Sequence, residues 1–151
     1  AIDSSQLQDS NLFTIGYFLF PHLPWVVDEN GKEVRGEDRN NWEKPEVYLG
    51  QLKYTNKLIL TMVKEIIKNV PHSCIILMSD HGYRQPYHLK VYYDHVIENY
   101  ALESFYMRNI LNAVYVFGDE IDIEGYSGIN TLRTVLNVIL SMDFDLIEEA
   151  K

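Results

Sequence analysis

SCIILMSDHG, residues 73–82, is an apolar run that ends abruptly in two polar residues and a glycine. Ser73–Ser79 has the length and apolar character of a strand buried inside a sheet. In open parallel sheets, ligands gather at the carboxyl ends of the strands, where loops meet and backbone groups are free. Asp80 and His81 follow directly on this strand. The stretch therefore predicts a sheet and a candidate site at its edge.

The residues upstream predict a second strand and a long helix. Leu12–Phe20, LFTIGYFLF, is apolar at every alternate position on both faces, as expected for a central strand covered on both sides. Residues 45–70 carry apolar side chains at three-and-four spacing with lysines between them, which predicts an amphipathic helix that ends at Pro71. Strand, helix and strand in this order predict a right-handed parallel crossover.

The residues downstream predict one more strand and a closing helix. Ile110–Phe117 is apolar, and Asn130–Met142 has its apolar residues on one helical face, with Ser127 as an amino-terminal cap. Tyr83–Tyr106 has no clean period, apart from a candidate helix over residues 94–105. The expected fold class is α/β, a partly parallel sheet with flanking helices. Residues 1–11 are expected to be a frayed lead-in and 12–151 one domain.

Composition restricts the classes of partner. The net charge is −9, and the thirteen Lys and Arg form no basic stripe, so nucleic acid is not expected as a partner. The single cysteine, Cys74, excludes an internal disulfide and a thiolate zinc cluster. No apolar run is long enough to span a bilayer, and no membrane contact is expected for this segment itself. Because the chain starts at Ala1 without a methionine, we expect the natural protein to be longer.

Two strand ends carry the candidate chemistry. Asp80 and His81 supply a carboxylate and an imidazole, which suit Mn, Zn, Mg or Ca about equally well, although Asp-His-Gly also serves as a plain turn. His22 follows the strand Leu12–Phe20, and parallel strands would bring it to the same edge. Arg84 could hold sulfate or phosphate oxygens through its planar guanidinium, or could form a surface ion pair.

The order of these motifs resembles the carboxyl-terminal part of the alkaline-phosphatase/sulfatase superfamily. The segments that carry the likeness are FLFPHLPWVVDENGK, YLGQLKYTNKLILTMVKEII, SDHGYR, ILNAVYVFGD and YSGINTLRTVLNVIL, which together cover most of the chain. The chain looks most like a bacterial membrane-anchored sulfatase-like protein, and more distantly like lipoteichoic acid synthases and phosphoethanolamine transferases. The resemblance implies that the chain is a fragment of an alkaline-phosphatase-like domain.

The resemblance also implies an activity and a setting. It implies that Asp80 and His81 hold a divalent metal ion. It also implies that His22 faces the substrate or a metal and could assist the leaving group. The reaction would be hydrolysis or transfer of a sulfate or phosphate ester on the extracytoplasmic face of a bacterial membrane. The nucleophile and an acidic ligand of these families are not identifiable here, so the rest of the catalytic domain is the implied partner and this isolated piece is expected to be inactive.

Two other interpretations remain open from the sequence. The chain could be a non-catalytic extracytoplasmic interaction module that keeps the same fold, which would account for the missing nucleophile. It could also be a small flavodoxin-like binding domain, for which a glycine-rich phosphate loop is expected after the first strand. Pro21-His22-Leu23-Pro24 is not such a loop.

Overall fold

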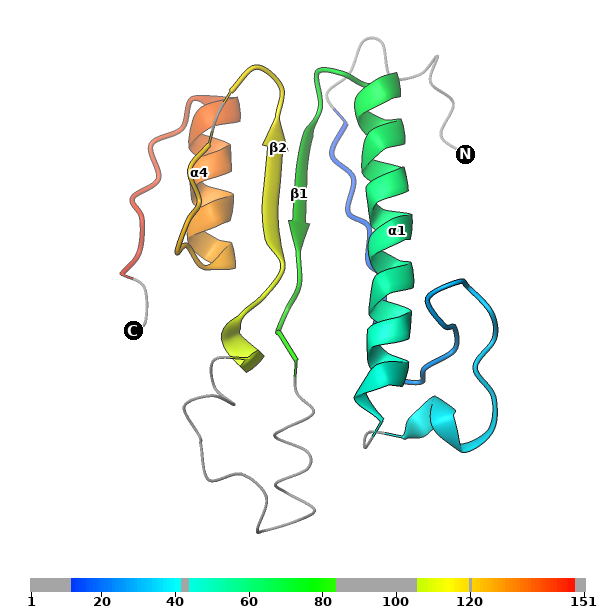
Figure 1. Ribbon diagram of the computed structural model, residues 1–151. Coiled ribbons are helices and arrows are strands. Elements are labelled where there is room, and N and C mark those ends of the chain that lie inside the picture. The colour runs from blue at the N-terminus through cyan, green and yellow to red at the C-terminus, as the bar shows by residue number, and fades with distance from the viewer. Residues whose placement is uncertain (1–11, 42–43, 84–105, 120, 149–151) are drawn as a thin grey trace.

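The computed structural model describes residues 12–41, 44–83, 106–119 and 121–148. Along the chain, the 3-10 helix η2 (Gly36–Asn40) precedes the helix α1 (Pro45–Asn69), the strands β1 (Cys74–Met78) and β2 (Asn112–Val116), and the helix α4 (Gly128–Leu140). In Figure 1 the two strands stand at the centre, with α1 on one side and α4 on the other. The chain is therefore a mixed α/β protein, as the sequence predicted.

The long helix α1 confirms the prediction for residues 45–70. Pro45 occupies its first turn, where a missing N–H costs nothing, and the N–H of Val70 donates to the carbonyl of Ile66 to close the last turn. The fully buried positions of α1 are polar: Gln51 has no exposed surface and Thr55 has 4%. The apolar side chains of this helix are half-buried or exposed.

The two strands confirm the predicted segments with slightly narrower bounds, but their pairing differs from the prediction. β1 and β2 are antiparallel, with Ile76 opposite Val114. They form a two-stranded sheet and no parallel pair exists among the described residues, so the partly parallel sheet is not supported. Pairing continues past β1, where the N–H of Ser79 donates to the carbonyl of Leu111 over 3.0 Å. The strand paired with β1 is therefore β2, the next strand along the chain, which runs in the opposite direction.

The prediction of a buried central strand at Leu12–Phe20 was wrong. This segment has no strand assignment, and its large side chains face solvent, with Phe13 83%, Ile15 80% and Tyr17 84% exposed. In the view of Figure 1 it passes between β1 and α1 in the direction of β1. A strand that is apolar on both faces needs cover on both faces. A two-stranded sheet does not supply that cover, which accounts for the difference.

The helix α4 confirms the predicted closing helix, shifted by two residues toward the amino terminus. Ser127 caps it as expected: its Oγ accepts from the N–H of Asn130 over 3.4 Å, and its carbonyl accepts from Thr131. Val135 has no exposed surface and Trp25 has 4%, and these are the buried hydrophobic residues of the described chain. The apolar core is therefore small.

Several predictions lie outside the described residues: the frayed lead-in 1–11, the candidate helix 94–105, and Arg84. Within the described part of the chain, no helix is long and apolar enough to cross a membrane.

Candidate functional site

The candidate site is the end of β1, where the backbone remains bound to the returning chain. Ser79 holds this end doubly, since its Oγ also accepts from the N–H of Leu111 over 2.9 Å. The N–H of Gly82 then donates to the carbonyl of Met107 over 2.7 Å. A Cβ at Gly82 would collide with the carbonyl oxygen of Tyr106 and lie 2.6 Å from that of Asn109. Glycine is needed here because the backbone of the returning chain approaches closely.

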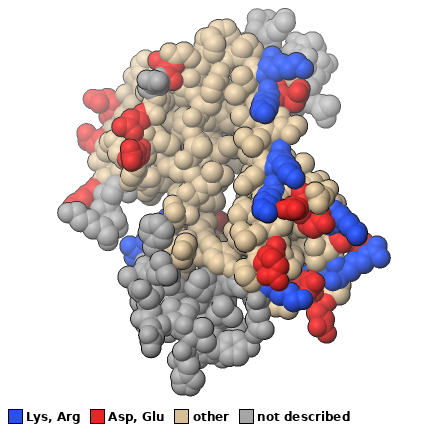
Figure 2. All heavy atoms as spheres, in the orientation of Figure 1, with Lys and Arg blue, Asp and Glu red and all other residues tan. Residues whose placement is uncertain are grey.

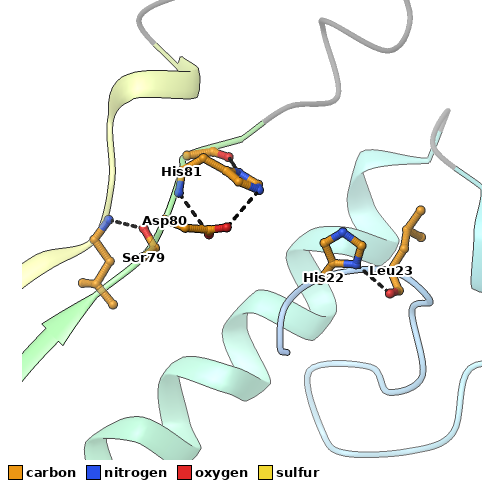
Figure 3. A network of polar contacts seen from close by, with 7 residues as sticks. His22, Leu23, Ser79, Asp80 and His81 are labelled. Atoms are coloured by element: carbon orange, nitrogen blue, oxygen red, sulfur yellow. Dashed lines mark hydrogen bonds and ion pairs between the residues drawn. The ribbon is translucent and has the colours of Figure 1, made fainter. Parts of the chain in front are cut away.

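Asp80 and His81 lie next to each other on this backbone. The Oδ1 of Asp80 accepts from the N–H of His81 over 3.0 Å, and its Oδ2 lies 3.8 Å from the Nε2 of His81 (Figure 3). The Asp80 side chain is 86% exposed, whereas that of His81 is 26% exposed. The imidazole is thus packed in place beside a carboxylate that solvent can reach.

A second hydrogen bond determines which nitrogen of His81 is available to a ligand. The Nδ1 of His81 lies 2.7 Å from the carbonyl oxygen of Gly82. Because a carbonyl only accepts, the hydrogen of the neutral ring is on Nδ1, and Nε2 keeps its lone pair. Backbone carbonyls hold metal-binding histidines in this way in many proteins. The nitrogen beside the Asp80 carboxylate is therefore the one able to bind a cation.

The two groups fit a divalent cation but do not complete its coordination. Oxygen and nitrogen ligands bind zinc at about 2.0–2.2 Å, so two atoms 3.8 Å apart can reach one ion between them. No group of three or more His, Cys, Asp or Glu that could hold a metal occurs among the described residues. A cation at this position would need further ligands from elsewhere.

His22 lies on a different loop and is not joined to the other two predicted site residues. Its exposed ring makes its contact with its own neighbour, Nδ1 lying 2.8 Å from the carbonyl oxygen of Leu23. Figure 3 shows it beside α1, across from the end of β1. No hydrogen bond or ion pair links His22 to Asp80 or His81, although all three are described. The structure therefore brings Asp80 and His81 together without a bond from either of them to His22.

Gln51 fixes the loop that carries His22, and sequence reasoning missed it. Its Oε1 accepts from the N–H of Val26 over 2.7 Å, and its Nε2 donates to the carbonyl of His22 over 3.0 Å. A buried amide that satisfies both a backbone donor and a backbone acceptor fixes the loop at this position along α1. The sequence feature that could have revealed this role is a polar residue on the apolar face of the predicted helix. Gln51 lies about one turn after Tyr48 and about one turn before Thr55.

An aromatic row connects the His22 loop with the end of β1. The rings of Trp25 and Tyr48 have centroids 5.5 Å apart, and those of Tyr48 and Tyr83 are 4.7 Å apart. Burial, with a smaller contribution from Tyr48, raises the pKa of Tyr83 to about 12. The Tyr83 phenol is therefore protonated at neutral pH, and the row is an uncharged wall from one loop to the other.

The turn after Val27 is also fixed to α1, by charge. Glu29 and Lys53 form an ion pair of 2.9 Å, and the Nζ of Lys57 donates to the carbonyl of Glu29 over 2.7 Å. The N–H groups of Lys32 and Asn30 donate to the Asp28 carboxylate and lower its pKa. Figure 2 shows charged side chains of both signs gathered on the side of the molecule where α1 lies, while the face over the strands carries few. Glu29 thus docks this turn on α1, while Asp28 holds the turn itself together.

Comparisons with protein-family models, with curated proteins and with solved structures found no match.

Proposed function

We propose that the chain is part of a metal-dependent sulfatase-like hydrolase or phospho-/sulfo-ester transferase, with Asp80 and His81 as two of its metal ligands. The observation that supports this most directly is the state of His81. Its Nδ1 is occupied by the Gly82 carbonyl, and its free Nε2 stands 3.8 Å from the Asp80 carboxylate. A plain turn does not need an imidazole oriented in this way. The ion proposed is Mn, Zn, Mg or Ca.

The remaining groups take roles around this pair. A divalent cation would offset negative charge on a transferred sulfuryl or phosphoryl group and activate a nucleophile. His22, exposed on its loop, would donate a proton to the leaving alcohol or contact the substrate. Arg84, next to Tyr83 in sequence, would hold the ester oxygens. The aromatic row would form one wall of the substrate site.

The proposed site is incomplete in this chain, and its partner is the rest of the same catalytic domain. Two protein ligands are too few for a stable metal centre, and no group of three or more His, Cys, Asp or Glu that could hold a metal lies in the described part of the chain. We therefore propose that this segment turns over no ester by itself. The proposed setting is the extracytoplasmic face of a bacterial membrane.

The test is titration calorimetry with Mn²⁺ and Zn²⁺ on the wild-type chain and two variants that preserve side-chain size, Asp80→Asn and His81→Gln. We expect weak binding by wild type and a loss of at least tenfold in affinity for each variant, because each removes a ligand. The matched control is His72→Gln, since His72 is exposed at the other end of β1 and packs on Phe117. Its affinity should equal that of wild type.

Two results would contradict the proposal. One is metal binding that survives in both site variants, which would put the ion elsewhere. The other is wild-type binding too weak to detect at millimolar metal. Hydrolysis of an aryl sulfate or aryl phosphate by the isolated chain would contradict the narrower claim that the missing part of the domain supplies the nucleophile.

A second candidate function is a non-catalytic interaction module, and one observation favours it. The backbone groups of Cys74, Ile76 and Met78 that point away from β2 have no hydrogen-bond partner among the described residues, and the apolar segment Leu12–Leu19 is exposed. Open sheet edges and exposed apolar side chains are typical of surfaces that take up another chain. Absence of metal binding with retained binding of a protein partner would favour this function.

A further inference from the structure

The segment Met142–Glu148 runs back along α4 and is held there by two asparagines of the helix. The amide of Asn137 donates to the carbonyl of Phe144 over 3.0 Å and accepts from the Phe144 N–H over 2.8 Å. The amide of Asn130 repeats this at Ile147, with bonds of 2.8 and 2.9 Å. Each asparagine thus pairs with one residue's backbone as a neighbouring strand would. We call this segment the return segment.

The spacing of the two asparagines matches an extended chain. Asn130 and Asn137 are seven positions apart on α4, which corresponds to about 10.5 Å along a helix. Phe144 and Ile147 are three positions apart, which corresponds to roughly 10 Å along an extended chain. Between them, Arg133 donates to the carbonyl of Asp145 over 2.6 Å. The helix therefore presents a row of side chains that fits a peptide backbone.

The return segment is held mainly through its backbone, and its side chains are only partly covered. Phe144 is 37% exposed, Leu146 45% and Ile147 41%. Each of the bonds above joins a side chain of α4 to a backbone group of the segment. More than half of each of these side chains is covered in the closed monomer, so a detached segment must be covered again by an equivalent surface. The same segment of another copy can make the same bonds and cover the same surface.

The connection between helix and segment is short and strained. Ser141 ends α4 with φ 51° and ψ 40°, in the left-handed region that favours glycine. This conformation reverses the chain direction and lets the segment fold back on its own helix (Figure 1). Strained short hinges favour exchange of the connected element between copies, because the strain is released when the hinge opens.

We propose that the row Asn130, Arg133 and Asn137 is a binding site for an extended peptide, and that its occupant in trans is the return segment of a second copy of this chain. In the exchanged dimer, Ser141 takes an ordinary negative φ, and each copy's segment pairs with the partner's asparagines. The bonds of the closed monomer are reproduced, and the strain at both hinges is removed.

The test measures the dimer association constant by sedimentation equilibrium on the full chain, in wild type and two hinge variants. Ser141→Val disfavours a positive φ and should raise this constant roughly tenfold or more, whereas Ser141→Gly relieves the strain and should lower it by a similar factor. A third variant adds Asn130→Ala and Asn137→Ala to Ser141→Val. It should be monomeric, because the binding row is removed.

Each alternative result is decisive. A dimer that persists when both asparagines are replaced overturns the proposal, because association then uses another surface such as Leu12–Leu19. A Ser141→Val chain that stays monomeric at about millimolar concentration also overturns it. If circular dichroism shows that Ser141→Val does not fold, the comparison of wild type with Ser141→Gly decides, and equal association constants overturn the proposal.

Discussion

At the scale of single residues, polar side chains bound to the backbone determine where the loops of this protein lie. Gln51 positions the His22 loop, Ser79 holds the end of β1, and Asn130 and Asn137 hold the return segment. A buried polar side chain of this kind contributes modestly to stability when its hydrogen bonds are made. Its removal leaves the backbone groups that it bonded without partners. The loops that carry the candidate chemistry therefore depend on a few amides and hydroxyls.

Replacement of Gln51 tests this dependence. Gln51→Leu keeps the side-chain volume but leaves the N–H of Val26 and the carbonyl of His22 without their partner. We expect the free energy of unfolding to fall by about 2 kcal/mol, measured by urea denaturation. Asn56→Leu, at an exposed position of the same helix, is the control and should stay within about 0.5 kcal/mol of wild type. Equal effects of the two changes would argue against a bound loop.

At the scale of elements, α4 shows how local signals and packing combine. Its start is determined by Ser127, its buried face by Val135 and Thr131, and its end by the left-handed Ser141. Asn112 of β2 donates to the Oγ1 of Thr131 over 2.7 Å and so joins the sheet to this helix. The helix is thus attached through polar contacts to the strand on one side and the return segment on the other.

Removal of the cap tests the contribution of the first turn. Ser127→Ala deletes the oxygen that accepts from Asn130, and the free energy of unfolding should fall by about 1 kcal/mol. Thermal unfolding followed by circular dichroism measures this. Thr61→Ala is a matched hydroxyl deletion on α1, where the Oγ1 donates to the Lys57 carbonyl at an exposed site, and should change stability by less than about 0.5 kcal/mol. A Ser127 effect no larger than this would rule out a role for the cap.

At the scale of the whole molecule, the described chain lacks the cover that its apolar segments require. The sheet has two strands, the edge of β1 away from β2 has no hydrogen-bond partner among the described residues, and Leu12–Leu19 is exposed. Isolated two-stranded sheets are only marginally stable in water. Within the described part of the chain, the exposed apolar side chains of Leu12–Leu19 are therefore left without cover.

Charge substitutions in the exposed segment test this arrangement. The double variant Phe13→Lys with Ile15→Lys should leave the free energy of unfolding within about 0.5 kcal/mol of wild type, because both side chains face water. Val135→Ala, at a position without exposed surface, should lower stability by about 2 kcal/mol. A loss in the double variant as large as that of Val135→Ala would mean that residues 12–20 are buried in solution, as their pattern predicts.

The sequence by itself determined the elements whose signals are local. The positions of α1, β1, β2 and α4 and the cap at Ser127 could be predicted because helical period, apolar runs and capping hydroxyls act over a few residues. It also placed Asp80 and His81 directly after a strand. Only the tertiary structure decided that β1 pairs antiparallel with β2, that Leu12–Phe20 is uncovered, and that His22 stays apart from Asp80. The physical reason is that strand pairing and burial depend on surfaces that lie far away along the chain. A local apolar pattern shows that a segment should be buried, but it does not show which other segment buries it.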